Sequence, residues 1–135
     1  MNRTPPLVLL ADDDAQLRGV LQRGLEREGY RVLATGSAET AYELLGSERA
    51  DAVLLDVRMP TMSGLALYLA IVNRWPALEG RVAIMTDDAE AGDVDVRPWL
   101  ERNPCAVLRK PCDLGEVSAW LRLVTQVPIR ERVNG

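Results

Sequence analysis

The fold of this chain is decided by residues 7–14, LVLLADDD. Five consecutive apolar residues between a proline and a run of charge are typical of a short strand that is buried on both faces. Strands of that kind belong to parallel sheets, which helices cover on both sides. The three aspartates follow the carboxyl end of this strand, where α/β sheets bind their ligands. The stretch therefore predicts an α/β domain with an acidic site at one edge of its sheet.

The alternation of a short apolar run with an amphipathic segment continues along the chain. We expect five strands, at residues 7–11, 31–34, 52–55, 82–85 and 106–108. Apolar residues at 17, 20, 21 and 25 have helical spacing, and this helix should end near Gly29. Further helices should begin at Ser37, at Ser63 or Gly64, near Pro98 and at Asp113. This order of elements predicts a parallel sheet with helices on both faces.

Size and composition narrow the class of protein. The 135 residues suit one domain, which we place at residues 1–125, followed by a tail at 126–135. The net charge of −4 argues against a nucleic-acid-binding surface, and no apolar run approaches the roughly 20 residues of a membrane span. The segment 7–11 is too short for a signal peptide, and Cys105 and Cys112 fit no disulfide framework. We therefore expect a cytoplasmic location.

Polar residues follow four of the five expected strands. In chain order they are Asp12 and Asp13, Asp56, Thr86 and Lys110. Parallel strands bring their carboxyl ends to one edge, so these side chains should share a pocket. Carboxylates that repel one another need a cation, and a site with only oxygen ligands suits Mg²⁺. A lysine and a hydroxyl beside Mg²⁺ indicate the chemistry of phosphoryl transfer.

Lys110 is the only lysine in a chain with fifteen arginines. Lysine offers a flexible point charge where arginine offers a rigid fork, so a lone lysine beside acidic residues indicates a phosphate site. Histidine is absent, which means that the chain cannot supply its own histidine base or phosphoryl carrier.

Asp14 is better explained as a cap of the following helix, because acids favour helix amino termini.

Four motifs, taken in this order and spacing, give the chain its resemblance to a known family. They are LLADDD at 9–14, LLDVRMP at 54–60 with Gly64, IMT at 84–86, and KP at 110–111. Over residues 7 to about 125 the chain resembles the receiver domain of bacterial two-component response regulators. The resemblance implies a flavodoxin-like sheet with the strand order 2-1-3-4-5 and a cis bond between Lys110 and Pro111.

The resemblance also implies a role for each residue of the pocket. Asp56 would accept the phosphoryl group, and Thr86 and Lys110 would contact it. The Mg²⁺ ligands would be the carboxylates of Asp12, Asp13 and Asp56 and the main-chain carbonyl of Arg58.

The implied donor is a phosphohistidine on a sensor histidine kinase or a histidine phosphotransfer protein. The domain would act as a signalling switch, and its only reactions would be its own phosphorylation and dephosphorylation. Its output would be protein–protein contact with a downstream protein or an attached domain, without a membrane or a nucleic acid.

Two residues depart from the family's usual pattern. Val107 stands where an aromatic residue is usual, which puts the usual coupling to Thr86 in doubt. Asp87 stands where a small residue is usual, and its charge should oppose a phosphoryl group of about −1.5 to −2. We therefore expect Asp87 to slow phosphorylation or to shorten the life of the phosphorylated state. Asp88, together with residues 105–111, resembles receivers attached to hybrid sensor kinases.

The third helix contains eight consecutive apolar residues, at 65–72. The residues that we expect to face the sheet are Leu65, Tyr68, Leu69 and Val72. That choice places Leu67 and Ile71 on another face, where they would form a partner surface.

Two other functions fit parts of the pattern. Asp12 and Asp14, two residues apart after a strand, suit a phosphatase of the haloacid-dehalogenase type, in which Asp12 would be the nucleophile. Gln16 stands where such a phosphatase has threonine, and the chain is too short for a cap domain. A pseudo-receiver that binds partners without being phosphorylated is the other alternative.

Overall fold

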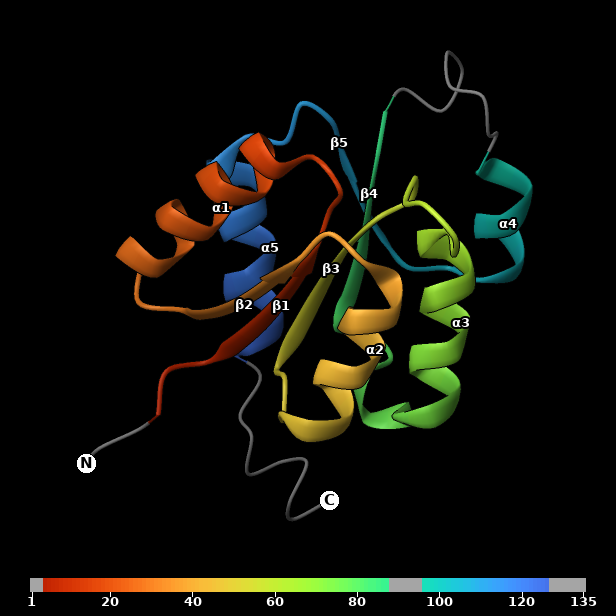
Figure 1. Cartoon of the computed structure of the whole chain (residues 1–135), viewed down its shortest axis with the longest axis horizontal. Coiled ribbons are helices and arrows are strands. Elements are labelled where there is room, and N and C mark those ends of the chain that lie inside the picture. The colour runs from red at the N-terminus through yellow and green to blue at the C-terminus, as the bar shows by residue number, and fades with distance from the viewer. Residues whose placement is uncertain (1–3, 88–95, 127–135) are drawn as a thin grey trace.

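In the computed structural model, five parallel strands form one sheet in the order β2-β1-β3-β4-β5, and helices cover both faces (Figure 1). The structure describes residues 4–87 and 96–126. The elements are, in chain order, β1 (Leu7–Ala11), α1 (Ala15–Arg27), β2 (Arg31–Thr35), α2 (Ala38–Ser47), β3 (Ala52–Asp56), α3 (Gly64–Arg74), the 3₁₀ turn η1 (Pro76–Leu78), β4 (Val82–Thr86), α4 (Arg97–Arg102), β5 (Ala106–Arg109) and α5 (Leu114–Thr125). The predicted fold class and strand order are confirmed.

The central strands send alternate side chains into two separate apolar layers. Val8 and Leu10 of β1 pack with residues of α1 and α5, whereas Leu9 packs with residues of α2 and α3. Accordingly, α1 and α5 lie on one face of the sheet, and α2 and α3 lie on the other (Figure 1). A shift of one residue would exchange the two layers, so the enclosed core fixes the register of the strands.

Side-chain caps begin the helices close to the carboxyl ends of the strands. Asp14 accepts hydrogen bonds from the main-chain N–H groups of Gln16 and Leu17, at 3.0 and 3.2 Å. Ser37, Ser63 and Asp113 cap the starts of α2, α3 and α5 in the same way. The predicted caps are confirmed, including the cap at Asp14. Pro98 lies in the first turn of α4, as predicted, and the loop expected before it falls mostly outside the described residues.

The predicted inward face of α3 is only partly right: Tyr68 is buried as predicted and Leu65 and Val72 are partly buried, but the other assignments are wrong. Leu67 and Ile71 are fully buried, whereas Leu69 is 44% exposed. The start of α3 is pressed against β3, because a Cβ on Gly64 would lie only 2.1 Å from the main-chain oxygen of Asp56. That contact turns residues 64, 67, 68 and 71 toward the core, and an unbroken apolar run offers no contrast from which to predict it. Leu67 and Ile71 are therefore core residues and no partner surface.

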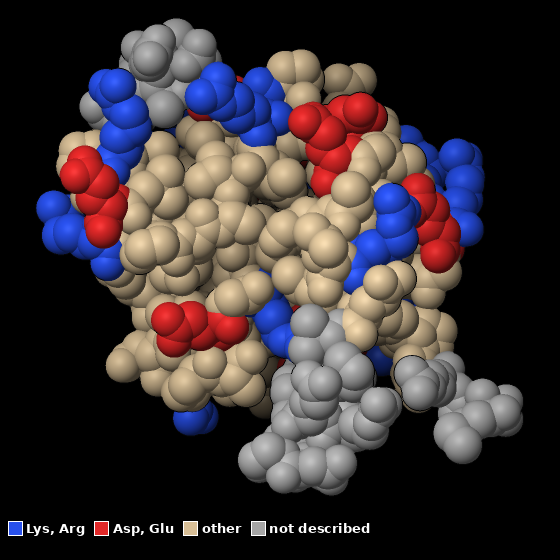
Figure 2. All heavy atoms as spheres, turned by 180° about the vertical axis from the view of Figure 1, so that it is seen from behind, with Lys and Arg blue, Asp and Glu red and all other residues tan. Residues whose placement is uncertain are grey.

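Charged side chains are mixed by sign on the face that Figure 2 shows. There, basic and acidic residues of the described chain alternate around a largely uncharged centre. This face therefore offers no continuous basic surface of the kind that binds nucleic acid. Within residues 4–87 and 96–126, no helix has both the length and the apolar character needed to cross a bilayer.

Candidate functional site

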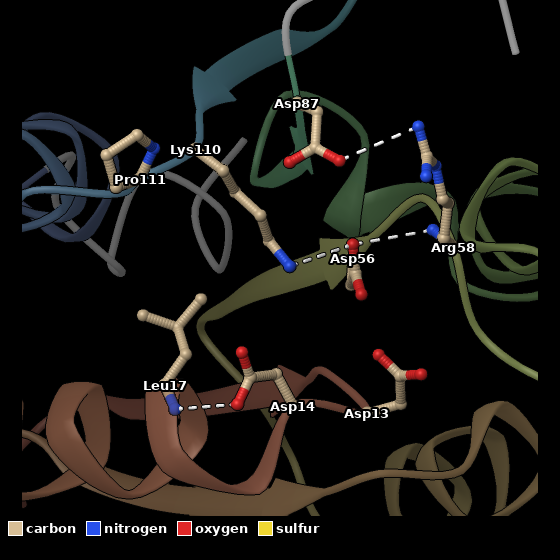
Figure 3. Close-up of a pocket in the computed structure, with 8 residues that line it drawn as sticks. All are labelled: Asp13, Asp14, Leu17, Asp56, Arg58, Asp87, Lys110 and Pro111. Carbon is tan, nitrogen blue, oxygen red and sulfur yellow. Dashed lines mark hydrogen bonds and ion pairs between the residues drawn. The ribbon is translucent and has the colours of Figure 1, made fainter. Parts of the chain in front are cut away.

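The register of the strands brings their polar ends to one edge of the sheet. Ala11 pairs with Leu55, so Asp12 emerges beside Asp56, and the main-chain N–H of Lys110 donates to the main-chain oxygen of Thr86 at 2.8 Å. A pocket of about 600 Å³ opens at this edge (Figure 3). Its lining residues are Asp13, Asp14, Leu17, Asp56, Arg58, Asp87, Lys110 and Pro111.

Three carboxylates converge at this edge, two of them in the lining of the pocket and that of Asp12 buried behind it. Asp12, Asp13 and Asp56 each offer an oxygen that lies within 4.8 Å of the other two. Asp12 is fully buried and Asp56 is 4% exposed, whereas Asp13 is exposed. One oxygen of Asp12 accepts the main-chain N–H of Asp14 at 2.9 Å, which orients the buried carboxylate toward Asp56. The predicted convergence of the three aspartates is confirmed.

Lys110 reaches from the end of β5 into the same cluster (Figure 3). Its Nζ lies 3.1 Å from Asp12 Oδ2 and 3.2 Å from Asp56 Oδ1. The following peptide bond, to Pro111, is cis, as the resemblance implied. One ammonium therefore faces two buried carboxylates and, since it is a single positive charge, leaves the cluster with a negative excess.

The electrostatics of the pocket show this excess. Burial and, after it, the charge of Asp12 raise the pKa of Asp56 to about 7 against the opposing effect of Lys110. Burial alone would lower the pKa of Lys110, but the charges of Asp56 and Asp12 outweigh it, and the pKa is raised. The ammonium is the ion-pair partner of Asp12 Oδ2, which among the described residues has no well-aligned hydrogen bond. The ammonium of Lys110 thus only partly neutralises the cluster of carboxylates.

This donor set fits a hard divalent cation. All the side-chain ligand atoms are carboxylate oxygens, which Mg²⁺ prefers, and Mg²⁺ keeps coordination positions for water or phosphate. Arg58, two residues after Asp56, lines the pocket, and its main-chain N–H donates to Asp56 Oδ1 at 3.4 Å. The residues expected to hold the metal therefore lie together, and their ligand roles stay predictions.

Thr86, like the fully buried Asp12, is not among the residues that line the acidic pocket. It lines a neighbouring cavity of about 280 Å³ between β4, α4 and β5, which Val107 also lines. Thr86 is the last residue of β4 and is almost buried, at 9% exposure. Asp87 lines both this cavity and the acidic pocket, so the two adjoin at the end of β4, and the contact of the Thr86 hydroxyl with the pocket stays a prediction.

The family model for the response regulator receiver domain matches residues 8–122. This chain belongs to that family. The matched range includes all four motifs and every predicted site residue. The match ends short of residue 125, so the predicted domain boundary stays a prediction.

Similar receivers occur in larger proteins of different kinds. The chain is 34% identical to the DNA-binding transcriptional regulator NtrC of Proteus hauseri, 32% identical to the transcriptional regulatory protein AfsQ1 of Streptomyces coelicolor and 35% identical to the sensor histidine kinase AruS of Pseudomonas aeruginosa. These matches cover 94%, 96% and 90% of the chain, but only 26%, 55% and 12% of the three relatives. The predicted origin in a hybrid kinase therefore stays a prediction.

Solved receiver structures share the fold. A response regulator receiver domain from Clostridium thermocellum superposes with a TM-score of 0.80 at 22% identity and covers 96% of this chain and 99% of its own. The response regulator TrrA of Thermotoga maritima, solved in complex with Mg²⁺ and beryllofluoride, gives a TM-score of 0.75 at 23% identity, over 88% of this chain and 98% of that one.

The receiver pocket contains an ion pair that was not predicted from the sequence. Arg58 Nη2 lies 3.6 Å from Asp87 Oδ2, and the two side chains are 46% and 54% exposed (Figure 3). The pair joins the segment after β3 to the end of β4. The sequence places these opposite charges two residues after Asp56 and one residue after Thr86. Only the fold brings them together.

Proposed function

We propose that this receiver accepts a phosphoryl group on Asp56 in a Mg²⁺-dependent reaction and signals through protein contacts. The observation that carries the proposal is the position of Asp56. Its carboxylate lies at the open pocket, within 4.8 Å of the oxygens of two other aspartates and 3.2 Å from the only lysine of the chain. A carboxylate nucleophile, a cation site and an ammonium are the groups that phosphoryl transfer requires.

The cation would be held by the carboxylates whose negative charge Lys110 only partly neutralises. Asp12, Asp13 and Asp56 would supply carboxylate oxygens, and Arg58 would supply its main-chain carbonyl. Mg²⁺ at this position would neutralise the cluster and polarise the phosphoryl oxygens. The structure of TrrA in complex with Mg²⁺ and beryllofluoride supports this assignment, because that chain shares the fold.

The transfer step follows from the geometry of the pocket. A carboxylate oxygen of Asp56 would attack the phosphorus of a phosphohistidine on a sensor histidine kinase or a histidine phosphotransfer protein. A P–O bond forms as the P–N bond breaks, and the electron pair of the broken bond returns to the imidazole. Lys110 would then pair with a phosphoryl oxygen. Attack of water on the same phosphorus would later release phosphate and restore Asp56.

The output would begin at Thr86. Thr86 lines the cavity between β4, α4 and β5, and phosphorylation of Asp56 would draw its hydroxyl toward the phosphoryl group. That movement would change the surface around α4 and β5, which a downstream protein or an attached domain would detect. A cytoplasmic location fits this reaction scheme and stays a prediction.

The direct test is chemical labelling. The protein is treated with acetyl phosphate and Mg²⁺, and intact and peptide mass spectrometry should find one phosphoryl group on Asp56. Asp56→Asn and chelation of Mg²⁺ should abolish the label. Asp14→Asn is the matched control, because asparagine caps a helix as well as aspartate does, and it should label normally.

Two results would overturn the proposal. A label on Asp12 would support the phosphatase alternative, in which Asp12 is the nucleophile. Absence of any label, combined with absence of Mg²⁺ binding in a titration, would support a pseudo-receiver.

A further inference from the structure

Thr61 has a backbone conformation that threonine rarely adopts. Its φ is +68°, and it is the one residue other than glycine with positive φ in the described part of the chain. A β-branched side chain in this left-handed region is a genuine outlier, which persists only where surrounding contacts compensate for the strain. Thr61 is exposed, so tight packing does not supply that compensation.

The compensating contact comes from Glu39 in the first turn of α2. The Thr61 hydroxyl lies 2.6 Å from Glu39 Oε2 and also 2.6 Å from the main-chain oxygen of Pro60. A hydroxyl has one hydrogen and serves one acceptor at a time, and an ionised carboxylate is the stronger acceptor of the two. The other oxygen of Glu39 accepts the Ser37 hydroxyl at 3.2 Å, which orients the carboxylate toward Thr61.

Thr61 lies in the segment 57–63, whose two ends are joined to each other beside the end of β3. The main-chain N–H of Gly64 donates to the main-chain oxygen of Val57 at 2.9 Å, and Gly64 leaves no room for a Cβ against Asp56. The base of the segment is therefore rigid. At Thr61 the contact with Glu39 joins the middle of the segment to α2.

We propose that Glu39 is a positioning residue for the metal site and acts through Thr61. By holding Thr61 in its left-handed conformation, Glu39 keeps the segment 57–63 in one shape. That shape sets the position of Arg58, whose main-chain carbonyl is the expected fourth protein ligand. The inference rests on the proposed Mg²⁺ site and adds a control of that site by a helix that contributes no ligand.

The test measures Mg²⁺ affinity by calorimetric titration of the full chain. Glu39→Gln should weaken binding about threefold to tenfold, the effect expected when one charge-assisted hydrogen bond no longer orders a ligand segment. Glu43→Gln is the matched control, because it removes the same charge from an exposed position of the same helix. It should bind Mg²⁺ as the wild type does.

A second substitution separates positioning from charge. Glycine adopts positive φ without strain, so Thr61→Gly should make Glu39 dispensable. The double variant Glu39→Gln/Thr61→Gly should bind Mg²⁺ within about twofold of Thr61→Gly alone, the margin left when the strained residue is gone. The three-bond amide coupling of Thr61, measured by NMR, should change in Glu39→Gln and stay unchanged in Glu43→Gln.

The outcomes are distinguishable. If the wild type binds no Mg²⁺, the proposed function fails. If the wild type binds Mg²⁺ and Glu39→Gln binds equally well, the positioning role is wrong. If Glu39→Gln weakens binding by the same factor in the wild type and in the Thr61→Gly variant, Glu39 acts through its charge, and the role through Thr61 is wrong.

Discussion

The two edges of the sheet both bury charge, but they arrange it in opposite ways. At the amino edge, Arg81 is 7% exposed and its guanidinium donates to the main-chain oxygens of Val124, at 2.6 Å, and Asp51, at 3.4 Å. The Asp51 carboxylate accepts the main-chain N–H of Leu7 at 2.8 Å. At the carboxyl edge, the like charges of Asp12 and Asp56 lie side by side with one ammonium between them.

The difference is that the charge at the amino edge is paired within the chain, whereas the negative charge at the carboxyl edge is only partly neutralised. A buried guanidinium surrounded by oxygens is satisfied within the chain, and it fastens the end of α5 to the sheet. Two buried carboxylates share one lysine at the carboxyl edge, and the proposed Mg²⁺ would supply the further positive charge. We therefore expect substitutions at the amino edge to change the free energy of unfolding, and substitutions at the carboxyl edge to change Mg²⁺ binding and phosphorylation.

The largest effect is expected at Arg81. Arg81→Met should lower the free energy of unfolding by about 2–4 kcal/mol, because it leaves buried oxygens without their donor. Urea unfolding measures this change, and Arg74→Met, at an exposed position of α3, is the control. Mg²⁺ affinity measured on the folded variant should stay unchanged. A variant with normal stability and lost Mg²⁺ binding would reverse the assignment of the two edges.

Asp56 should show the opposite sign. Without Mg²⁺ at pH 8, Asp56→Asn should raise the free energy of unfolding by on the order of 1–3 kcal/mol, since it removes a repelled, buried charge. The folded-state pKa of about 7 lies above the ordinary value of 3.8. The contribution of Asp56 to stability is therefore fully present below about pH 4 and is lost as the pH rises through about 7.

Unfolding of the wild type and of Asp56→Asn between pH 4 and pH 8 measures this difference. The stability of the two proteins should diverge as the pH rises, and added Mg²⁺ should narrow the gap by stabilising the wild type. Parallel curves across this range would mean that the Asp56 carboxylate is not destabilised by its neighbours.

Lys110 should compete with the metal. Lys110→Met removes an ammonium about 3 Å from two expected ligands, so Mg²⁺ affinity should rise by about tenfold while labelling by acetyl phosphate slows. Lys110→Arg keeps the charge and should stay within about threefold of the wild-type affinity. Calorimetry provides the affinities. Weaker Mg²⁺ binding in Lys110→Met would show that the lysine supports the metal site and does not compete with it.

The smallest effect is expected at Asp87. An exposed ion pair contributes little, so Asp87→Gly should change the free energy of unfolding by less than about 0.5 kcal/mol. Labelling by acetyl phosphate should become about two to three times faster, or the label should last longer, because one negative charge leaves the mouth of the pocket. Asp87→Asn, which keeps the side-chain shape, separates charge from size. If neither variant changes the labelling rate or the lifetime, the charge of Asp87 has no influence on Asp56.

Much of the site could be predicted because strand ends are local signals. A short apolar run followed by Asp12 or Asp56 identifies both the strand and the edge at which its carboxylate emerges. The lone Lys110 and the caps at Asp14 and Ser37 are likewise readable from a few neighbouring residues. Each of these predictions needed only the rule that parallel strands end at one edge.

The predictions that the structure corrects or leaves open concern side chains whose environment depends on packing between several segments. The inward face of α3 depends on how Gly64 packs against β3, and its apolar run contains no contrast that would show this. Val20 belongs to the helical spacing of apolar residues in α1, yet it is 54% exposed, because Leu21, Gly24 and Leu25 face the core instead. The position of Thr86 depends on α4 and β5, which enclose a cavity of their own.

The amino-acid sequence alone determined the class of the fold, the order of its elements and the identity of the acidic residues, because these follow from hydrophobic period and from residue type. Only the tertiary structure decided which charges are neighbours: Arg58 with Asp87, Glu39 with Thr61, and Arg81 with the end of α5. The physical reason is that each of these contacts joins segments far apart in the chain, and its geometry depends on how whole layers pack. Local pattern carries no information about that packing.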